Sequence, residues 1–127
     1  MNRERDVIVD FHSVAPVFQV DDVESTAAWY EGFLGFKSQT FPQTPPFDEA
    51  ILWRDDVRIL LPAASRETQA QAGALFTVKG IRGFYDAIQE RVTITKRLIR
   101  SADGTLSFEM RDPNGCALTF TEEPDAA

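Results

Sequence analysis

Hydrophobic positions along the chain follow one pattern twice. Apolar residues come first at strand spacing and then at helical spacing, and the same order returns about sixty residues later. The first copy is carried by Phe18, Val20, Val23, Ala27, Tyr30 and Leu34, and the second by Phe76, Val78, Ile81, Tyr85 and Ile88. Each copy closes with an Arg-Asp pair and a hydrophobic strand. Two copies of one small unit bury their apolar faces against each other, so we expect a paired sheet with any site between the halves.

The first copy has the pattern of one βαβββ unit. Residues 13–20 read as a strand, and Asp21 with Glu24 resembles the capping box that begins a helix. Apolar residues keep helical spacing as far as Leu34, and Gly35 is the expected stop. The remaining strands are expected at 36–41, 49–54 and 57–61, with a proline-rich loop at 42–47.

The second copy repeats this order. We expect a strand at 74–78, a helix with apolar residues from Ile81 to Val92, and strands at 93–99, 106–111 and 116–121. The last two strands form a hairpin, because in Asp112-Pro113-Asn114-Gly115 the proline pre-sets φ and the glycine can adopt a positive φ. The domain is therefore expected at 13–122, as modules 13–62 and 73–122 joined by a polar linker, 63–72. The remaining residues are a charged leader, 1–12, and a tail, 123–127. The run Val7-Ile8-Val9 in the leader could add an edge strand or be disordered.

Composition narrows the class of protein. The 127 residues are 43% hydrophobic, which is enough for one domain with a core that needs no disulfide or structural metal. Thirteen basic and twenty acidic residues give a net charge of −7, which argues against nucleic-acid binding and favours cationic ligands, although an acidic surface also simply keeps a protein soluble. The chain has a single cysteine, no signal peptide and no apolar run of membrane-spanning length. We therefore expect a cytoplasmic protein that makes no contact with membranes.

Three motifs carry a resemblance to a known family. They are Pro16-Val17-Phe18-Gln19-Val20-Asp21-Asp22-Val23, then Ser25, Trp29-Tyr30-Glu31 and Leu34-Gly35-Phe36, and finally Arg111-Asp112-Pro113-Asn114-Gly115. Over residues 13–122 the chain resembles the vicinal oxygen chelate superfamily, which includes glyoxalase I, extradiol dioxygenases and bleomycin-resistance proteins. The resemblance implies an α+β fold of two tandem βαβββ modules whose sheets curl around a cleft, usually in a homodimer.

The resemblance also implies where a metal would be held. Metal-dependent members take His, Gln or Glu ligands from the first and last strands of each module, and those positions correspond here to Ala15, Leu60, Gly73 and Thr119. Ala, Leu and Gly have no donor atom and a neutral Thr hydroxyl is a poor ligand, so we expect no metal and no cofactor. Glu109 is the best donor nearby, and one carboxylate does not make a site.

Strand alternation predicts which side chains line the cleft. Counting from Ala15 places Val14, Phe18 and Val20 under the helices, and Trp53 with the core. Phe41 and Phe47 flank prolines, so they are candidates for stacking on a ligand or for burial at a dimer interface. The expected ligand-binding residues are Val17, Gln19, Phe41, Phe47, Leu52, Arg58, Leu60, Ser107, Glu109, Thr119 and Thr121, with Ala50, Leu75, Thr77 and Ala117 as further cleft neighbours.

These observations favour a non-catalytic protein that binds a small organic molecule. Like the bleomycin-resistance proteins it resembles, it would sequester a cationic or aromatic antibiotic in the cleft of a homodimer. One alternative is a metal-dependent lyase, isomerase or dioxygenase with ligands from unusual positions. Another is a structural dimerisation module.

Overall fold

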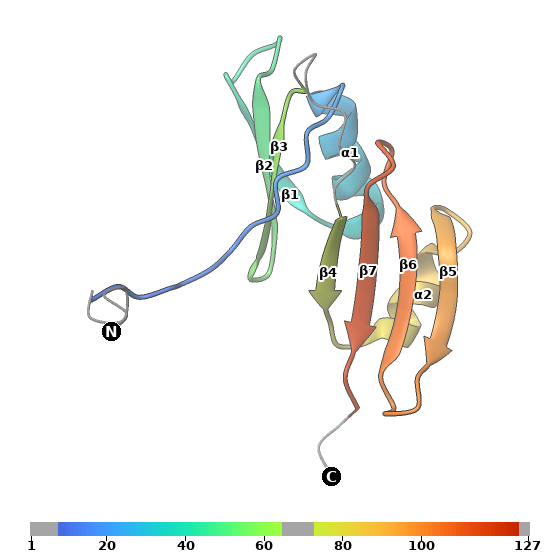
Figure 1. The fold of residues 1–127 in the computed structure, drawn as a ribbon. Helices are drawn as coiled ribbons and strands as arrows, with labels where there is room; N and C mark the ends of the chain where they lie inside the picture. Colours follow the sequence, from blue (N-terminus) through green and yellow to red (C-terminus); the bar gives the residue numbers. More distant parts are fainter. Residues whose placement is uncertain (1–7, 65–72, 125–127) are drawn as a thin grey trace.

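Two βαβββ modules follow each other along the chain in a computed structural model that describes residues 8–64 and 73–124 (Figure 1). The α+β fold of two tandem modules predicted from the repeat is confirmed. The first module contains α1 (Val23–Leu34), β1 (Lys37–Phe41), β2 (Glu49–Arg54) and β3 (Val57–Pro62). The second contains β4 (Gly73–Thr77), α2 (Ile81–Ile88), β5 (Thr93–Arg100), β6 (Leu106–Arg111) and β7 (Ala117–Glu122).

Both modules use the same strand order. In the second, β4 pairs in parallel with β7, and β6 and β5 follow as antiparallel neighbours. In the first, β3, β2 and β1 are antiparallel, and the chain before α1 runs parallel to β3 through the bond from Phe18 N to Leu60 O (2.9 Å). The sequence repeat is therefore also a repeat of topology.

The predicted strand at 13–20 is reduced in the structure to two isolated bridges, from Val17 to Leu60 and from Val20 to Ala63. Pairing with β3 covers residues 16–20, and the residues before it have no strand partner among the described residues. The prediction that Val14 packs under the helices is wrong, because its side chain is 92% exposed. Phe18 and Val20 are fully buried, as predicted.

Local chemistry determines where the helices begin and end. Asp22, and not Asp21, caps α1, because its Oδ1 accepts a hydrogen bond from Ser25 N (3.0 Å). Gly35 ends α1 with φ of 70°, the left-handed conformation expected of a terminating glycine. The second helix is shorter than predicted, since α2 ends at Ile88 and Val92 lies in the turn that follows.

Each helix packs on one face of its own sheet. Side chains with at most 1% exposure in the first module include Phe18, Tyr30, Leu52, Ile59 and Leu61, and in the second they include Ile81, Phe108, Met110 and Leu118. Apolar burial on this scale is the main stabilising term, at about 25 cal/mol per Å². On the opposite face of each sheet the described residues place no helix, and in Figure 1 the four-stranded sheet shows this face, with α2 behind it.

One buried hydrogen-bond network joins the modules. The predicted turn at 112–115 is present, and in it Asp112 Oδ1 accepts from the backbone nitrogens of Asn114 (2.8 Å) and Cys116 (2.9 Å). Asp112 Oδ2 accepts from the Tyr30 hydroxyl of α1 at 2.8 Å, and burial and this carboxylate raise the pKa of Tyr30. Asn114 Nδ2 also donates to Thr26 Oγ1 of α1 (3.0 Å). The turn of the second module is thereby attached to the helix of the first.

Parts of the predicted organisation lie outside the described residues. These are residues 1–7 of the leader, which include Val7, most of the linker (65–72) and the end of the tail (125–127). Residues 8–12 form no strand. Neither helix in the described part of the chain is long and apolar enough to cross a membrane.

Replacing Tyr30 by Phe should lower the free energy of unfolding by about 1–3 kcal/mol, because it leaves a buried Asp112 oxygen without its donor. Urea unfolding at neutral pH measures the change. The control is Tyr85→Phe, since the Tyr85 hydroxyl has no hydrogen-bond partner among the described residues and Tyr85 also packs on a buried ring, that of Phe108. Equal losses in the two variants would contradict the role assigned to the Tyr30 hydroxyl.

Candidate functional site

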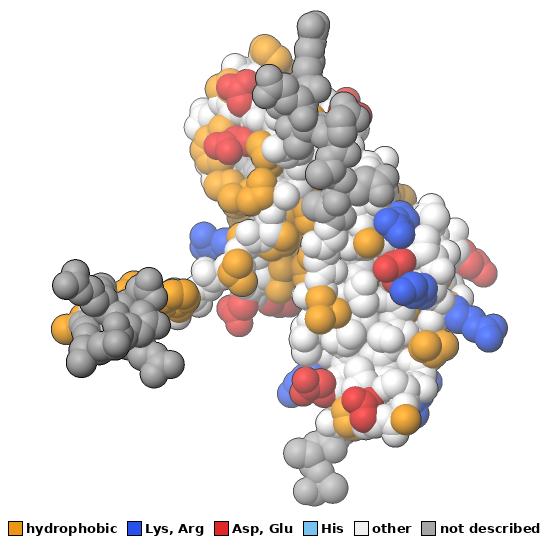
Figure 2. All heavy atoms as spheres, viewed as in Figure 1, with side chains coloured by type: hydrophobic (Ala, Val, Ile, Leu, Met, Phe, Trp, Pro, Cys, Tyr) orange, Lys and Arg blue, Asp and Glu red, His pale blue; other side chains and the backbone are white. Residues whose placement is uncertain are grey.

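The candidate site is built from the face of each sheet that has no helix on it, here called the open face. Side chains on these faces alternate with the buried core residues along each strand. Figure 2 views the open face of the four-stranded sheet, where few hydrophobic or charged side chains are seen. This face is therefore accessible in the single chain.

The open face of the second module brings distant residues into rows. Leu75 of β4 pairs with Thr119 of β7, and Thr119 pairs with Glu109 of β6. A neighbouring row joins three hydroxyl-bearing residues from the same strands, Thr77, Thr121 and Ser107. The residues expected to bind ligand in this module, Ser107, Glu109, Thr119 and Thr121, lie together on this face with Leu75, Thr77 and Ala117.

Glu109 is the acidic centre of this face. Its Oε2 accepts a hydrogen bond from Thr95 Oγ1 at 2.5 Å and lies 3.8 Å from Arg111 Nη2. The bond from Thr95 holds the pKa of Glu109 below its usual range, with smaller contributions from Lys96 and Arg111. Glu109 is therefore ionised and already partnered at neutral pH.

The open face of the first module is more apolar. Val17 pairs with Leu60, and Leu60 pairs with Ile51, so three aliphatic side chains form a row across the sheet. Arg58 pairs with Trp53 on the same face. Gln19 points to this side as well, because Phe18 and Val20 on either side of it are buried. Val17, Gln19, Arg58 and Leu60 thus lie where the strand pattern predicts.

Leu52 and its neighbour Ala50 were expected in the cleft, and this prediction is wrong. Both are fully buried in the core under α1, since Leu52 pairs with Ile59 and Ala50 with Leu61. The reason is the two-residue turn between β2 and β3, which pairs even-numbered residues with odd-numbered ones. For the same reason Trp53, which was expected in the core, lies half-buried on the open face.

The two loop phenylalanines are separated by the structure. Phe41 ends β1 and pairs with Glu49 at the edge of the open face, where it is half-buried. Phe47 is half-buried against the hydrophobic core of its module. Of the two, only Phe41 borders the candidate site.

The charges on the open faces differ in sign from the charge of the whole chain. Glu49 and Glu109 are acidic, and the basic residues paired along these faces are Lys37, Arg58, Lys96 and Arg111. The chain carries −7 overall, whereas these faces carry more positive than negative groups. Lys37 in particular lies opposite Trp53, beside the Arg58 pair.

The donor set at the positions implied for a metal does not suit a divalent ion. Val17 pairs with Leu60 in the first module, and Leu75 pairs with Thr119 at the equivalent place in the second. Ala15 and Gly73 each lie two residues before the first member of these pairs, so they also occupy equivalent positions. Only Thr119 among the four implied residues has a side-chain oxygen. Residues 8–64 and 73–124 contain no group of three His, Cys, Asp or Glu side chains that could hold a metal ion.

Replacing Thr95 by Val should raise the pKa of Glu109, because the main interaction that lowers it is lost. A folded-state pKa below the unfolded value stabilises the fold above the unfolded pKa, and this contribution disappears as the pH falls through the folded-state pKa. The variant should therefore lose less stability on acidification. Carboxyl-carbon NMR titration measures the pKa, with Thr93→Val, two residues earlier on β5, as control. A Glu109 pKa that is equal in both variants would contradict the assignment.

Comparison with known proteins identifies the fold. The sequence matches no protein-family model and no curated protein. Among solved structures, TioX from a Micromonospora species is similar with a TM-score of 0.78 at 14% identity, covering 89% of this chain and 100% of that one. A member of the glyoxalase/bleomycin resistance protein/dioxygenase superfamily from Sphaerobacter thermophilus has a TM-score of 0.74 at 20% identity, covering 89% and 98%. Lactoylglutathione lyase from Agrobacterium tumefaciens has a TM-score of 0.69 at 15% identity, covering 87% and 92%. The chain therefore has the vicinal oxygen chelate fold that its motifs predict.

Proposed function

We propose that this protein binds a small organic molecule on its open faces without transforming it. The observation that supports this most is the contrast between the faces: an aliphatic row of Val17, Leu60 and Ile51 on one, and hydroxyl groups around one carboxylate on the other. An apolar surface beside a few fixed polar groups is typical of small-molecule sites. An antibiotic is one member of this ligand class, and the superfamily name of one structural neighbour includes bleomycin resistance.

The residues at the implied metal positions favour binding over metal-assisted catalysis. A metal-dependent enzyme of this fold would need several donors, and Ala15, Gly73 and Leu60 offer none. Metal analysis of protein purified without chelator provides a direct check. A stoichiometric transition metal bound to the folded protein would contradict the proposal.

The charge of the ligand depends on which electrostatic effect dominates. The net charge of −7 attracts cations at long range, and on that ground a cationic ligand is expected. At contact distance, however, the groups on the open faces decide, because salt screens charges beyond about 8 Å. Glu109 is already bonded to Thr95, whereas Arg58 faces Trp53 without a carboxylate partner among the described residues. We therefore propose an aromatic or aliphatic ligand with an acidic end.

A second copy of the chain would complete the site. On the open faces Val17 is 51% exposed, Leu75 66% and Ile99 55%. A ligand lying on one such face keeps its outer side in water, whereas small-molecule sites bury about 70–90% of the ligand surface. The segment before the first module is equally uncovered, since Phe11 is 95% exposed and the segment leads away from the body (Figure 1). We propose that a homodimer covers both.

Reversing the charge of Arg58 on the open face distinguishes attraction of the ligand by nearby groups from attraction by the net charge of the protein. We expect 2-naphthoate to bind more tightly than 2-naphthylmethylamine, and Arg58→Glu to weaken 2-naphthoate binding about tenfold, as loss of one charge-assisted contact would. Isothermal titration calorimetry measures both affinities. The control is Arg82→Glu on the exposed surface of α2, which changes the net charge equally.

Equal effects of Arg58→Glu and Arg82→Glu would mean that only net charge matters and would contradict a site at Arg58. Tighter binding of the amine would instead support the cationic ligand.

Sedimentation velocity over a range of concentrations tests the dimer. We expect a species of twice the 14.3 kDa chain mass, and Phe11→Ser with Val14→Ser should weaken the dimer because both side chains are exposed in the single chain. The control replaces the polar neighbours, Asp10→Ala with His12→Ala. A monomer at every concentration would contradict the proposal.

A further inference from the structure

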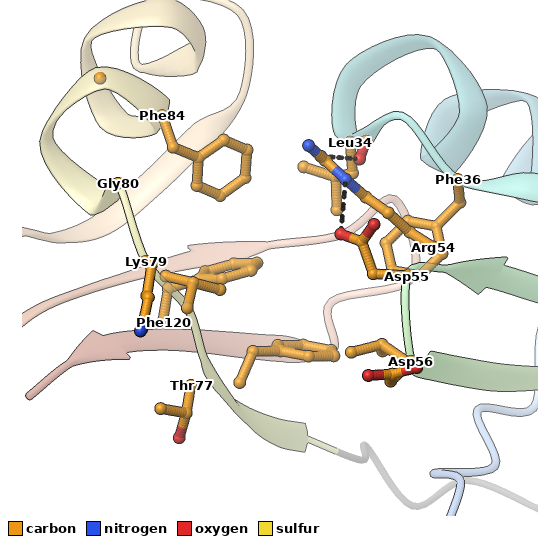
Figure 3. Close-up of a pocket in the computed structure, with 14 residues that line it drawn as sticks. Leu34, Phe36, Arg54, Asp55, Asp56, Thr77, Lys79, Gly80, Phe84 and Phe120 are labelled. Carbon is orange, nitrogen blue, oxygen red and sulfur yellow. Dashed lines mark hydrogen bonds and ion pairs between the residues drawn. The ribbon is translucent and has the colours of Figure 1, made fainter.

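A cavity of about 600 Å³ lies where the two modules meet, on the side of the sheets that carries the helices (Figure 3). One wall is formed by the end of α1 and by residues 54–57 around the turn between β2 and β3. The other wall is formed by the end of β4 and the first turns of α2, with Phe76 and Phe120 as its floor. These two rings belong to the buried face of the four-stranded sheet, opposite Leu75 and Thr119. The cavity is therefore distinct from the open faces.

The sequence repeat explains why the cavity exists. In the repeat, the turn after Arg54 corresponds to the turn after Arg111, and α2 corresponds to α1. The later turn spans residues 112–115 and reaches α1 through the bonds to Tyr30 and Thr26. The earlier turn consists only of Asp55 and Asp56. The helix at the equivalent place is α2, and its capping residue, Gly80, makes no side-chain hydrogen bond. One junction between the modules is thus closed by hydrogen bonds, and its counterpart stays open.

Gly83 on α2 keeps this space free. A Cβ atom added to Gly83 would meet no atom within 4 Å, and the residue has no positive φ that would oppose a side chain. A glycine inside a helix costs stability relative to residues with a side chain. The open space beside it is where a ligand could enter without moving the backbone.

Aromatic rings form the lining. Phe76 and Phe120 stack with their centroids 5.0 Å apart, and Phe84 meets Phe120 edge-on at 5.2 Å. Phe36 lines the cavity from the opposite wall, as Figure 3 shows. A ring inserted here would find both faces and edges of other rings at favourable geometry. A volume of about 300–1,000 Å³ is typical of sites for small organic ligands.

Opposite charges stand at the two sides of the cavity. Arg54 is occupied, since its Nη1 donates to Leu34 O at 2.6 Å and its Nε lies 3.9 Å from Asp55 Oδ2. Asp56 remains on this side, and Lys79 lies on the other (Figure 3). An ammonium group would suit Asp56 and a carboxylate would suit Lys79.

We propose that this cavity is a second ligand site, specific for a small aromatic zwitterion of the amino-acid type. The ring enters among Phe36, Phe76, Phe84 and Phe120, and the charged end lies between Asp56 and Lys79. This site is independent of the function proposed for the open faces. It requires no second copy of the chain, because both walls belong to one chain.

A series with one ring and four charge states tests the proposal: L-tryptophan, tryptamine, indole-3-acetate and indole. Amide NMR shifts measured during titration report both the site and the affinity. We expect tryptophan to bind most tightly and the shifts to map to residues 54–57 and 76–84. The variant Gly83→Leu should fill the cavity and weaken tryptophan binding about tenfold or more.

The matched control is Gly32→Leu, since Gly32 is also helical and a Cβ there also meets nothing within 4 Å, but it does not line the cavity. Both leucine variants should raise the melting temperature, which verifies that they fold. Arg58→Glu should leave tryptophan binding unchanged, so failure at the open faces and failure here are distinguishable.

Three outcomes would overturn the proposal. They are no saturable shift with any of the four compounds, equal binding by Gly83→Leu and the original chain, or equal affinities for all four charge states.

Discussion

The buried carboxylate of Asp112 is the interaction on which the arrangement of the two modules depends. It accepts two backbone hydrogen bonds within its own turn and one from the Tyr30 hydroxyl of the other module. An unpaired carboxylate would be costly to bury, so the three donors must be in place together. Tyr30 is itself fully buried among the residues that hold α1 on its sheet. The same group therefore orders a hairpin and sets where the second sheet stands against the first helix.

Turn length makes the two copies differ. Five residues connect the paired Arg111 and Ala117 and reach α1, whereas two residues connect the paired Arg54 and Val57 and stop short of α2. The shorter turn leaves the Phe-lined cavity on the helical side. It also sets the register of β2 on β3, which puts Leu52 in the core and Trp53 on the open face. A difference of three residues thus determines both a cavity and the lining of a sheet.

Electrostatics acts differently at the two distances that matter for a ligand. The acidic excess of the chain determines which molecules approach. The groups that a ligand would touch on the open faces are more often basic, and Glu109 is already engaged with Thr95 and Arg111. Net charge alone is therefore a poor guide to the charge of these faces.

The sequence by itself determined the fold and much of its local structure. Strand alternation predicted that Phe18 and Val20 are buried. Residue type predicted that Gly35 ends a helix and that Asp112-Pro113-Asn114-Gly115 forms a turn. These features depend on neighbours only a few residues away. Only the tertiary structure decided the rest. The faces of Leu52 and Trp53 depend on hairpin register, the exposure of Val14 on whether a partner strand exists, and the cavity on how a turn in one module meets a helix in the other. Such contacts join residues that are far apart in the chain, so a local sequence pattern does not predict how these residues lie in space.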